Sequence, residues 1–319
     1  GQEIIELLGG KKIHPAWAVP GGVRGALSEA GRQHIQERLP EAKGTALDAL
    51  ARFKKLLRQY EHEAHIFGNF PTLFLGLVAA DGSWEHYGGN LRFVDSDGNV
   101  IADHIDPTRY REYIAEAVEP SSYLKSPYYR PLGYPHGIYR VGPLARLNIC
   151  SKMGTPLADE ELAEFRTCGH GAVTSSFFYH YARLVEILGA LELIEKAVED
   201  PDLLGHHLRA DAGINKPEGV GVSEAPRGTL FHHYEVDDHG LIVKVNLLIA
   251  TGQNNLAMNR TVAQIAKHYI RGTDIPEGML NRVEAGIRAF DPCLSCSTHA
   301  AGQMSMRVSL VAADGTVLN

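Results

Sequence analysis

The sequence predicts a mainly helical, mixed α/β fold, and three observations carry this prediction. Four segments repeat apolar side chains every three or four residues, the spacing along one face of an α-helix. Two pairs of short strand-like runs are separated by turns that contain Asp and Gly, the pattern of β-hairpins. Strands and helices do not alternate regularly, so we do not expect a parallel sheet of βαβ units.

The expected helices span residues 45–66, 173–198, 254–270 and 276–290. In the first of them, Leu47, Leu50, Phe53 and Leu57 recur at helical spacing. Pro201 lies just beyond the second, at a position where a helix commonly ends.

The expected strands are residues 72–79, 91–94, 100–102, 229–236, 241–250 and 305–311. Asp97 and Gly98 separate the second strand from the third and are a strong hairpin turn. Residues 237–240 (Asp-Asp-His-Gly) separate the fourth strand from the fifth and predict a second hairpin.

Length and charge exclude several classes of protein. The chain has 319 residues, enough for one large α/β domain or two ordinary ones. Its 31 basic and 38 acidic residues give a net charge of -7, which argues against a nucleic-acid partner. No apolar run is long enough to span a membrane, and no signal peptide is visible. Four cysteines suit a reducing compartment, so we expect a cytoplasmic location.

Nucleotide binding is not expected by the two commonest routes. No Gly-x-Gly-x-x-Gly follows a strand, and the chain has no Walker-type phosphate loop.

A Cys-x-x-Cys-x-x-His motif near the C-terminus is the sharpest chemical feature. Cys293, Cys296 and His299 follow one another at intervals of three residues. Thiolate pairs of this kind bind zinc, iron–sulfur clusters or nickel, or act as a redox dithiol. Structural zinc needs a fourth ligand, and Cys150 and Cys168 are at no useful spacing, so we expect those two to be buried apolar side chains.

A second feature is an anion-binding corner predicted from hairpin register. In a hairpin centred near residues 238–239, Arg227 pairs roughly with residue 250 or 251 and therefore meets Thr251. The helix expected from residue 254 would point its free N–H groups at the same place. Arginine, hydroxyl and helix N-terminus together favour an anion. The alternative is an Arg227–Glu224 pair on the surface.

These features together resemble the large subunit of nickel–iron hydrogenases. Residues 291–299 match its second metal-binding box, and residues 224–228 (Glu-Ala-Pro-Arg-Gly) match its active-site arginine segment. Residues 9–22 and 141–148 match two further stretches of the family. The wording of residues 250–255 most resembles the soluble, NAD-reducing branch. The resemblance implies a large-subunit fold with a long helical core and small β-hairpins.

The resemblance also implies a nickel–iron centre that carries one CO and two cyanides. Cys293 would be a terminal nickel ligand and Cys296 a bridging one. Arg227 would donate hydrogen bonds to one cyanide and Thr251 to the other, while Pro226 and Ala250 would form dry walls. His299 would bind Mg²⁺, to which Leu247 would offer its backbone carbonyl.

The implied reaction is reversible heterolytic cleavage of H₂, with a terminal thiolate or Arg227 taking the proton. Electrons would leave through Fe–S clusters of a partner small subunit, and flavin/NAD diaphorase subunits carrying FMN would reduce NAD⁺. A maturation endopeptidase and nickel chaperones are further implied partners. NADP- and F420-linked relatives remain open alternatives.

Two departures from the family pattern qualify this interpretation. The family's first box, Arg-x-Cys-x-x-Cys, is absent, so only two of four nickel ligands are present and the start is interpreted as incomplete. We therefore expect a catalytic domain at residues 1–299, inactive alone, and a tail at residues 300–319 that is cleaved on maturation. The alternatives are a non-catalytic structural relative and a Cys/His zinc or dithiol module.

Overall fold

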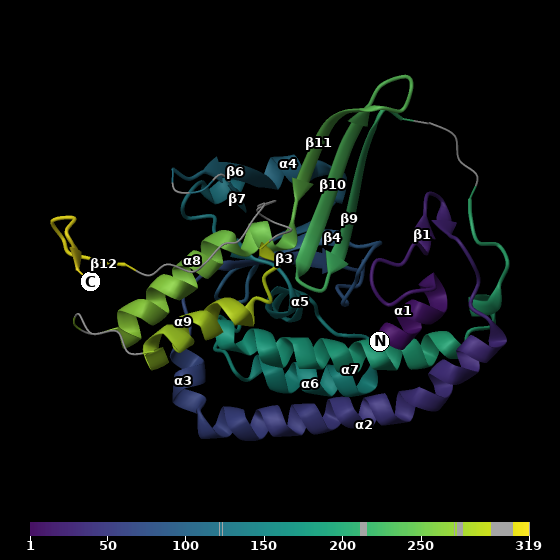
Figure 1. Cartoon of the computed structure of the whole chain (residues 1–319), viewed down its shortest axis with the longest axis horizontal. Coiled ribbons are helices and arrows are strands. Elements are labelled where there is room, and N and C mark those ends of the chain that lie inside the picture. Colours follow the sequence, from purple (N-terminus) through teal and green to yellow (C-terminus); the bar gives the residue numbers. More distant parts are fainter. Residues whose placement is uncertain are drawn as a thin grey trace.

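The long helices lie along one side of the molecule and the β-sheets along the other. The computed structural model describes residues 1–120, 122, 124–210, 216–270, 272, 277–294 and 309–318. Figure 1 shows α2 and α7 running side by side beneath the sheets, with α8 and α9 packed together at one end. No helix within these described ranges is both long and apolar enough to cross a membrane.

The helices confirm the mainly helical prediction and move several boundaries. The α-helices are α1 (Gln2–Gly9), α2 (Glu29–Gln59), α3 (Glu61–Ile66), α4 (Tyr110–Tyr113), α5 (Pro143–Ile149), α6 (Pro156–Arg166), α7 (Tyr179–Glu199), α8 (Ala250–Tyr269) and α9 (Glu277–Ala289). Short 3₁₀ helices are η1 (Pro107–Arg109), η2 (Arg130–Leu132), η3 (Ser176–Phe178) and η4 (Pro201–Leu204).

Helix α2 begins much earlier than the sequence pattern predicts. The side chain of Ser28 accepts a hydrogen bond from the backbone N–H of Gly31 and caps the helix, which then continues through Pro40. A proline inside a helix normally favours a break, and the residues around it are polar, so periodicity alone started the helix at residue 45. Packing of α2 against α7 outweighs the local preference.

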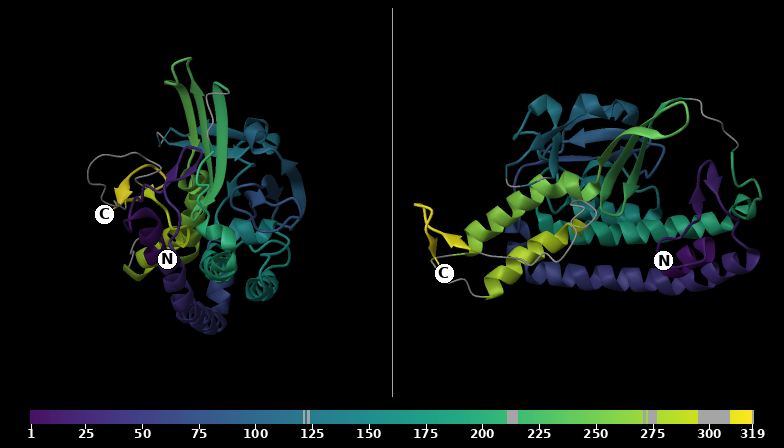
Figure 2. Two further views of the ribbon diagram at one scale, coloured as in Figure 1. Left: turned by 90° about the vertical axis from the view of Figure 1, so that its right-hand side faces the viewer. Right: turned by 45° about the horizontal axis from the view of Figure 1, so that its top comes forward.

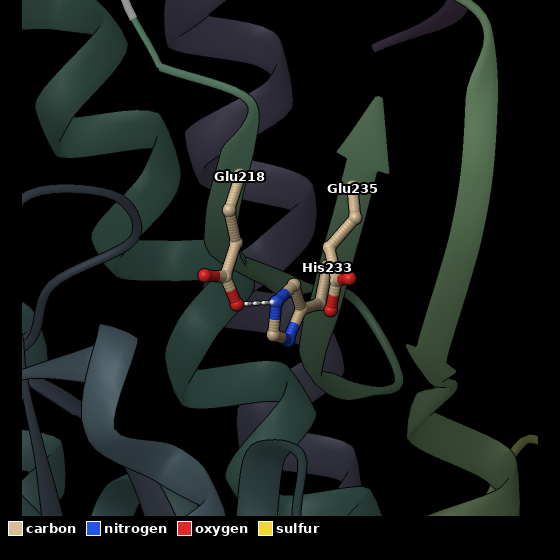
Figure 3. Close-up of side chains that lie close together, drawn as sticks. All are labelled: Glu218, His233 and Glu235. Atoms are coloured by element: carbon tan, nitrogen blue, oxygen red, sulfur yellow. Dashed lines mark hydrogen bonds and ion pairs between the residues drawn. The ribbon is translucent and has the colours of Figure 1, made fainter. Parts of the chain in front are cut away.

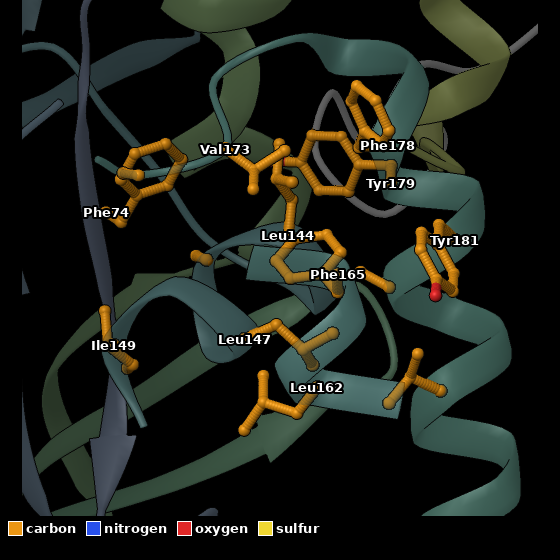
Figure 4. Packing of buried hydrophobic residues seen from close by; sticks show 14 of the residues in the cluster. Phe74, Leu144, Leu147, Ile149, Leu162, Phe165, Val173, Phe178, Tyr179 and Tyr181 are labelled. Atoms are coloured by element: carbon orange, nitrogen blue, oxygen red, sulfur yellow. The ribbon is translucent and has the colours of Figure 1, made fainter. Parts of the chain in front are cut away.

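Helix α7 starts later than expected because a 3₁₀ turn precedes it. The hydroxyl of Ser175 accepts from the N–H of Phe177 and opens η3, from which α7 continues at Tyr179. The first turn of α7 thereby places Phe178, Tyr179 and Tyr181 in the main core with α5 and α6 (Figure 4). Apolar burial of this kind is the main term that stabilises the fold.

In the described part of the chain the strands form sheets of two to four strands. The strands are β1 (Ala18–Val19), β2 (Gly22–Val23), β3 (Leu73–Val78), β4 (Asn90–Val94), β5 (Val100–Ile105), β6 (Ile114–Val118), β7 (Lys125–Tyr129), β8 (Tyr139–Arg140), β9 (Glu218–Ala225), β10 (Gly228–Val236), β11 (Ile242–Leu248), β12 (Leu310–Val311) and β13 (Val317–Leu318). The four-stranded sheet has the order β5-β4-β3-β8, and every residue of its strand β3 is buried.

A three-stranded antiparallel sheet, β11-β10-β9, carries the predicted second hairpin. Phe231 pairs with Leu248 and His233 with Asn246, which sets the register of β10 on β11. Strand β9, which the sequence pattern did not predict, pairs with the other edge of β10. Figures 1 and 2 show this sheet rising away from the helices, with α8 leading from its base into α9.

Candidate active site

Arg227 lies in a two-residue turn at the base of this sheet. Ala225 pairs with Gly228, so Pro226 and Arg227 are the central residues of the β9–β10 hairpin. The turn therefore belongs to a hairpin that precedes the predicted one, because residues 218–225 are themselves a strand. Arg227 still lies at the open end of the β10–β11 hairpin, where the register argument placed it.

The buried side chain of Arg146, on α5, forms hydrogen bonds with the backbone of this turn. Its Nη1 donates to the carbonyl oxygen of Ala225 at 2.9 Å, and its Nη2 donates to that of Pro226 at 3.2 Å. The same guanidinium forms ion pairs with Glu224 of β9, at 2.8 Å, and with Glu186 of α7, at 2.7 Å. Burial lowers the pKa of Arg146, but the two carboxylates raise it by more, so the guanidinium stays charged.

Glu224 is the centre of a second set of bonds that fixes the end of β9. Its Oε1 accepts from the backbone N–H of Leu77 at 3.0 Å and from the hydroxyl of Thr229 at 2.7 Å. Its side chain is fully buried, so it does not form the exposed pair with Arg227 that was the alternative interpretation. Three donors thus surround a buried carboxylate, as burial of such a group requires.

Two glycines let the backbone next to α5 approach the turn closely. A β-carbon on Gly142 would meet the carbonyl oxygen of Arg227 at 2.6 Å, and Gly142 has φ 95°. A β-carbon on Gly228 would meet Cγ2 of Val141 at 2.3 Å. Only glycine fits these approaches. The sequence segments 141–148 and 224–228, noted separately above, are therefore in direct contact.

Thr251 lies in the first turn of α8. The helix begins at Ala250, four residues earlier than predicted, and is preceded by Ile249, whose side chain cannot accept a hydrogen bond. Both Ala250 and Thr251 are buried. The Oγ1 of Thr251 accepts from the backbone N–H of Cys293 at 3.1 Å, which ties the C-terminal motif to the helix start.

Gln253 and Asn254, also near the start of α8, join the site to the rest of the fold. The side chain of Asn254 accepts from the N–H of Val141 at 2.9 Å and donates to its carbonyl oxygen at 3.3 Å. Gln253 donates to the carbonyl oxygen of Thr229 and accepts from the hydroxyl of Tyr139 at 3.0 Å. Both amides are buried, so each bond replaces water that burial has removed.

Asp291 brings the C-terminal segment to Arg227. The Nε of Arg227 donates to the carbonyl oxygen of Asp291 at 2.7 Å and lies 3.3 Å from its Oδ2. Asp291 has φ 51°, a left-handed conformation that turns the chain directly after α9. The carboxylate of Asp291 also attracts the guanidinium of Arg183 on α7. Burial lowers the pKa of Arg183, and this attraction offsets part of the decrease.

The remaining predicted residues have less structural support. Cys296 and His299 lie outside the described residues. Leu247 is on β11, opposite His232 of β10, and its proposed role as a carbonyl ligand stays a prediction. Pro226 is exposed in this chain, whereas Ala250 is buried. Cys150 is buried, as the sequence predicted, whereas Cys168 is only partly buried and packs against the same core.

The arrangement connects Arg227 and Thr251 to the same short segment, residues 291–293, which contains Cys293. Arg227 contacts Asp291, and Thr251 contacts Cys293, two residues later. Thiolate sulfur suits nickel and low-spin iron, and a guanidinium fork suits small anionic ligands. Arg227 and Thr251 are therefore joined through the 291–293 segment, and their role as an anion-binding corner stays a prediction. Sequence reasoning missed Arg146 and Glu186, whose only sign was an arginine within the mainly apolar helix 143–149.

Comparisons with known proteins place the chain in one family. The family model described as "Nickel-dependent hydrogenase" matches residues 95–299. The chain is 41% identical over 329 residues to the NAD-reducing hydrogenase HoxS subunit beta of Cupriavidus necator, covering 100% of this chain and 67% of that protein. This chain belongs to the nickel-dependent hydrogenase family.

Other relatives of this hydrogenase chain extend the comparison. It is 39% identical over 300 residues to a subunit of the F420-non-reducing hydrogenase of Methanothermobacter thermautotrophicus, covering 93% of this chain and 63% of that one. A crystal structure of an NAD⁺-reducing [NiFe]-hydrogenase in the H₂-reduced state superposes with a TM-score of 0.89 and 44% identity, over 93% of this chain and 66% of that one. The chain thus spans about two thirds of the length of its relatives.

A more distant structure shows that the fold extends beyond close sequence similarity. The Ni-Fe-Se hydrogenase from D. vulgaris Hildenborough matches with a TM-score of 0.71 at 21% identity, over 93% of this chain and 67% of that one. The predicted fold class, that of the hydrogenase large subunit, is therefore confirmed.

Proposed function

We propose that this chain is the part of a hydrogenase catalytic subunit that supplies the C-terminal half of the ligands of a nickel–iron centre. The reaction is the reversible heterolytic cleavage of H₂. The observation that carries the proposal is that Arg227 and Thr251 both bind the segment that contains Cys293. Soft thiolates beside a fixed cation are the donor set that a nickel–iron centre with anionic ligands requires.

The residues have distinct roles in this proposal. Cys293 is a terminal nickel ligand and Cys296 a bridging ligand. Arg227 and Thr251 would donate to the two cyanides, and Ala250, which is buried, and Pro226 would form the walls of the pocket. The nickel–iron centre supplies the Lewis acidity that polarises H₂. A terminal cysteine thiolate, or Arg227 in its neutral guanidine form, would take the proton that leaves, and the backbone bonds from Arg146 keep the Arg227 turn in place.

The ligand set is completed by residues that this sequence does not contain. Nickel in this family is held by four thiolates, so two further cysteines are required from the remaining third of the subunit. His299 and the Leu247 carbonyl complete a Mg²⁺ site in the same proposal. Residues 300–319 form the tail that a maturation endopeptidase removes after nickel chaperones have loaded the site.

The electron acceptor is proposed from the relatives. The named relatives include an NAD-reducing and several F420-non-reducing hydrogenases. The 41% identity to the former favours a cytoplasmic enzyme that passes electrons through a small Fe–S subunit to flavin/NAD subunits carrying FMN. No part of the chain is proposed to bind nucleic acid.

The test uses the full-length subunit produced with its partner subunits. Cys293→Ser is compared with Cys168→Ser, a matched thiol outside the site. We expect Cys293→Ser to lose nickel by elemental analysis, CO/CN bands by infrared spectroscopy and H₂ uptake, while Cys168→Ser keeps all three. Nickel retention and H₂ uptake in Cys293→Ser would refute the ligand assignment. Zinc without CO/CN bands in the wild type would favour the zinc-module alternative.

Maturation is tested by intact-mass measurement of the active enzyme. We expect a C-terminus at His299, with residues 300–319 missing. An active enzyme whose mass includes Asn319 would contradict the proposed cleavage.

A further inference from the structure

A second group of possible metal ligands lies on the β9–β10–β11 sheet, at the end opposite the Arg227 turn. Glu218 begins β9, and His233 and Glu235 lie on β10. One ligand atom from each of the three lies within 4.8 Å of the other two, and Figure 3 shows the side chains converging. We propose that these residues form a binding site for a divalent transition-metal cation such as Zn²⁺, separate from the nickel–iron ligands. The proposal does not depend on the proposed function.

Strand register places the two carboxylates face to face. Glu218 pairs directly with Glu235 across β9 and β10, so both side chains lie on the same face of the sheet. His233, two residues before Glu235, points to that face as well. Two like charges directly opposite each other destabilise a sheet, and a cation between them removes that penalty.

The imidazole of His233 is already oriented for coordination. Its side chain is only 4% exposed, and its Nε2 lies 2.7 Å from Oε1 of Glu218. Its Nδ1 lies 3.0 Å from the hydroxyl of Tyr110, which also accepts from the amide of Asn246 at 2.9 Å. In this structure Nε2 donates its proton to Glu218, because a carboxylate oxygen only accepts. A metal at Nε2 replaces that proton, and Nδ1 then carries the proton and donates it to the Tyr110 oxygen. Orientation by a neighbour of this type is typical of metal-binding histidines.

The two carboxylates have the freedom that coordination requires. Donor atoms around a tetrahedral zinc lie about 3.3 Å apart, so Glu218 must move slightly outward from its present hydrogen bond with His233. Its side chain is 56% exposed and can do so. Glu235 is held by Lys244 at 2.6 Å, and this ion pair competes with a metal. One imidazole and two carboxylates suit zinc or nickel better than Mg²⁺, which prefers oxygen ligands alone.

The expected consequence is a cross-link between β9 and β10 that is independent of the sheet hydrogen bonds. A ligand that binds only the folded state raises its stability. Zinc should therefore raise the thermal unfolding midpoint of the chain, and this readout does not require enzyme activity.

The test measures zinc binding to the full chain with Cys293 and Cys296 replaced by serine, so that the thiols do not contribute. We expect one zinc at micromolar free metal and a raised unfolding midpoint. His233→Gln and Glu235→Gln should each weaken zinc binding tenfold or more, and Mg²⁺ should not compete. His232→Gln is the matched control, because this neighbour points to the opposite face and bonds Tyr234.

One further variant keeps the test decisive if His233→Gln does not fold. Lys244→Gln releases Glu235 from its ion pair and should tighten zinc binding, the opposite of Glu235→Gln. The proposal would be overturned if Lys244→Gln and Glu235→Gln both left the zinc affinity unchanged. It would also be overturned if His232→Gln and His233→Gln weakened zinc binding equally. The absence of zinc binding by the parent protein would overturn it as well.

Discussion

The α-carbon of Gly142 lies against the carbonyl oxygen of Arg227, so that a β-carbon on Gly142 would meet that oxygen at 2.6 Å. The two residues are joined to different elements, Gly142 to the start of α5 and Arg227 to the β9–β10 turn. The position of Arg227 is therefore set by backbone contact from one side and by the Arg146 guanidinium from another.

Gly142→Ala should displace the Arg227 turn and lower H₂ turnover of the full-length enzyme tenfold or more. Gly154→Ala is the matched control, because Gly154 has a similar φ of 83° but a β-carbon added there would have no neighbour within 4 Å. Gly142 has φ 95° and ψ -162°, a region essentially restricted to glycine, so Gly142→Ala also costs about 1–3 kcal/mol of backbone strain. Turnover and urea unfolding separate the two effects, and equal turnover losses would contradict the contact argument.

The sequence predicted which segments meet near Arg227, but not the Arg146 side chain that binds the Arg227 turn. Periodicity and hairpin register placed Arg227 near the start of α8, and a motif placed Cys293 in the site. Strand β9 was not predicted because Gly219 and Gly221 weaken its strand pattern, and pairing with β10 overrides that preference. A segment of low strand propensity can still form a strand where a neighbouring strand supplies the hydrogen bonds.

No local sequence pattern marks the residues that pair with Arg146. Arg146 is 40 residues from Glu186 and 78 from Glu224, so only the tertiary fold brings the three together. A buried arginine inside a helix of apolar residues was the available sign that carboxylates must meet it, since an unpaired buried charge is unfavourable.

Arg146→Met should strongly destabilise the chain. It leaves Glu186 and Glu224 buried without their partner, and loss of one member of a buried ion pair costs about 3–5 kcal/mol. Urea unfolding measures the change. Adding Glu186→Gln and Glu224→Gln to Arg146→Met should recover part of the stability, because the remaining charges are removed.

A matched surface pair provides the control for that experiment. Arg109→Met breaks an exposed ion pair with Glu112 and should leave the unfolding midpoint unchanged. Equal shifts for Arg109→Met and Arg146→Met would show that burial does not control the effect.

Thr251→Val should release the backbone N–H of Cys293. Valine keeps the shape of threonine but cannot accept the hydrogen bond that the Thr251 hydroxyl accepts now. Loss of one such bond is about 1 kcal/mol, so amide exchange at Cys293 should accelerate about fivefold to tenfold. Thr251→Ser keeps the hydroxyl and should retain the slow exchange, and equal exchange in both variants would rule the bond out.

Cys150 and Cys168 should resist alkylation in the folded protein. Burial raises the pKa of Cys150 to about 12 and that of Cys168 to about 11, so neither forms much thiolate near neutral pH. The neutral thiols contribute stability below the ordinary thiol pKa of about 8.5, and this contribution is lost as the pH rises toward the raised values. Iodoacetamide labelling followed by mass spectrometry checks this, with urea-unfolded protein as the control. Rapid native labelling of Cys150 near pH 8 would contradict the burial argument.

The contact between Arg227 and Asp291 joins positions 64 residues apart in the chain. Because synthesis proceeds from the N-terminus and segments fold as they emerge, the β9–β10 turn leaves the ribosome well before its closing residue does. The corner around Arg227 thus stays open on one side during translation until residue 291 has been made. A ligand of this corner can therefore reach it during translation, before the closing residue is in place.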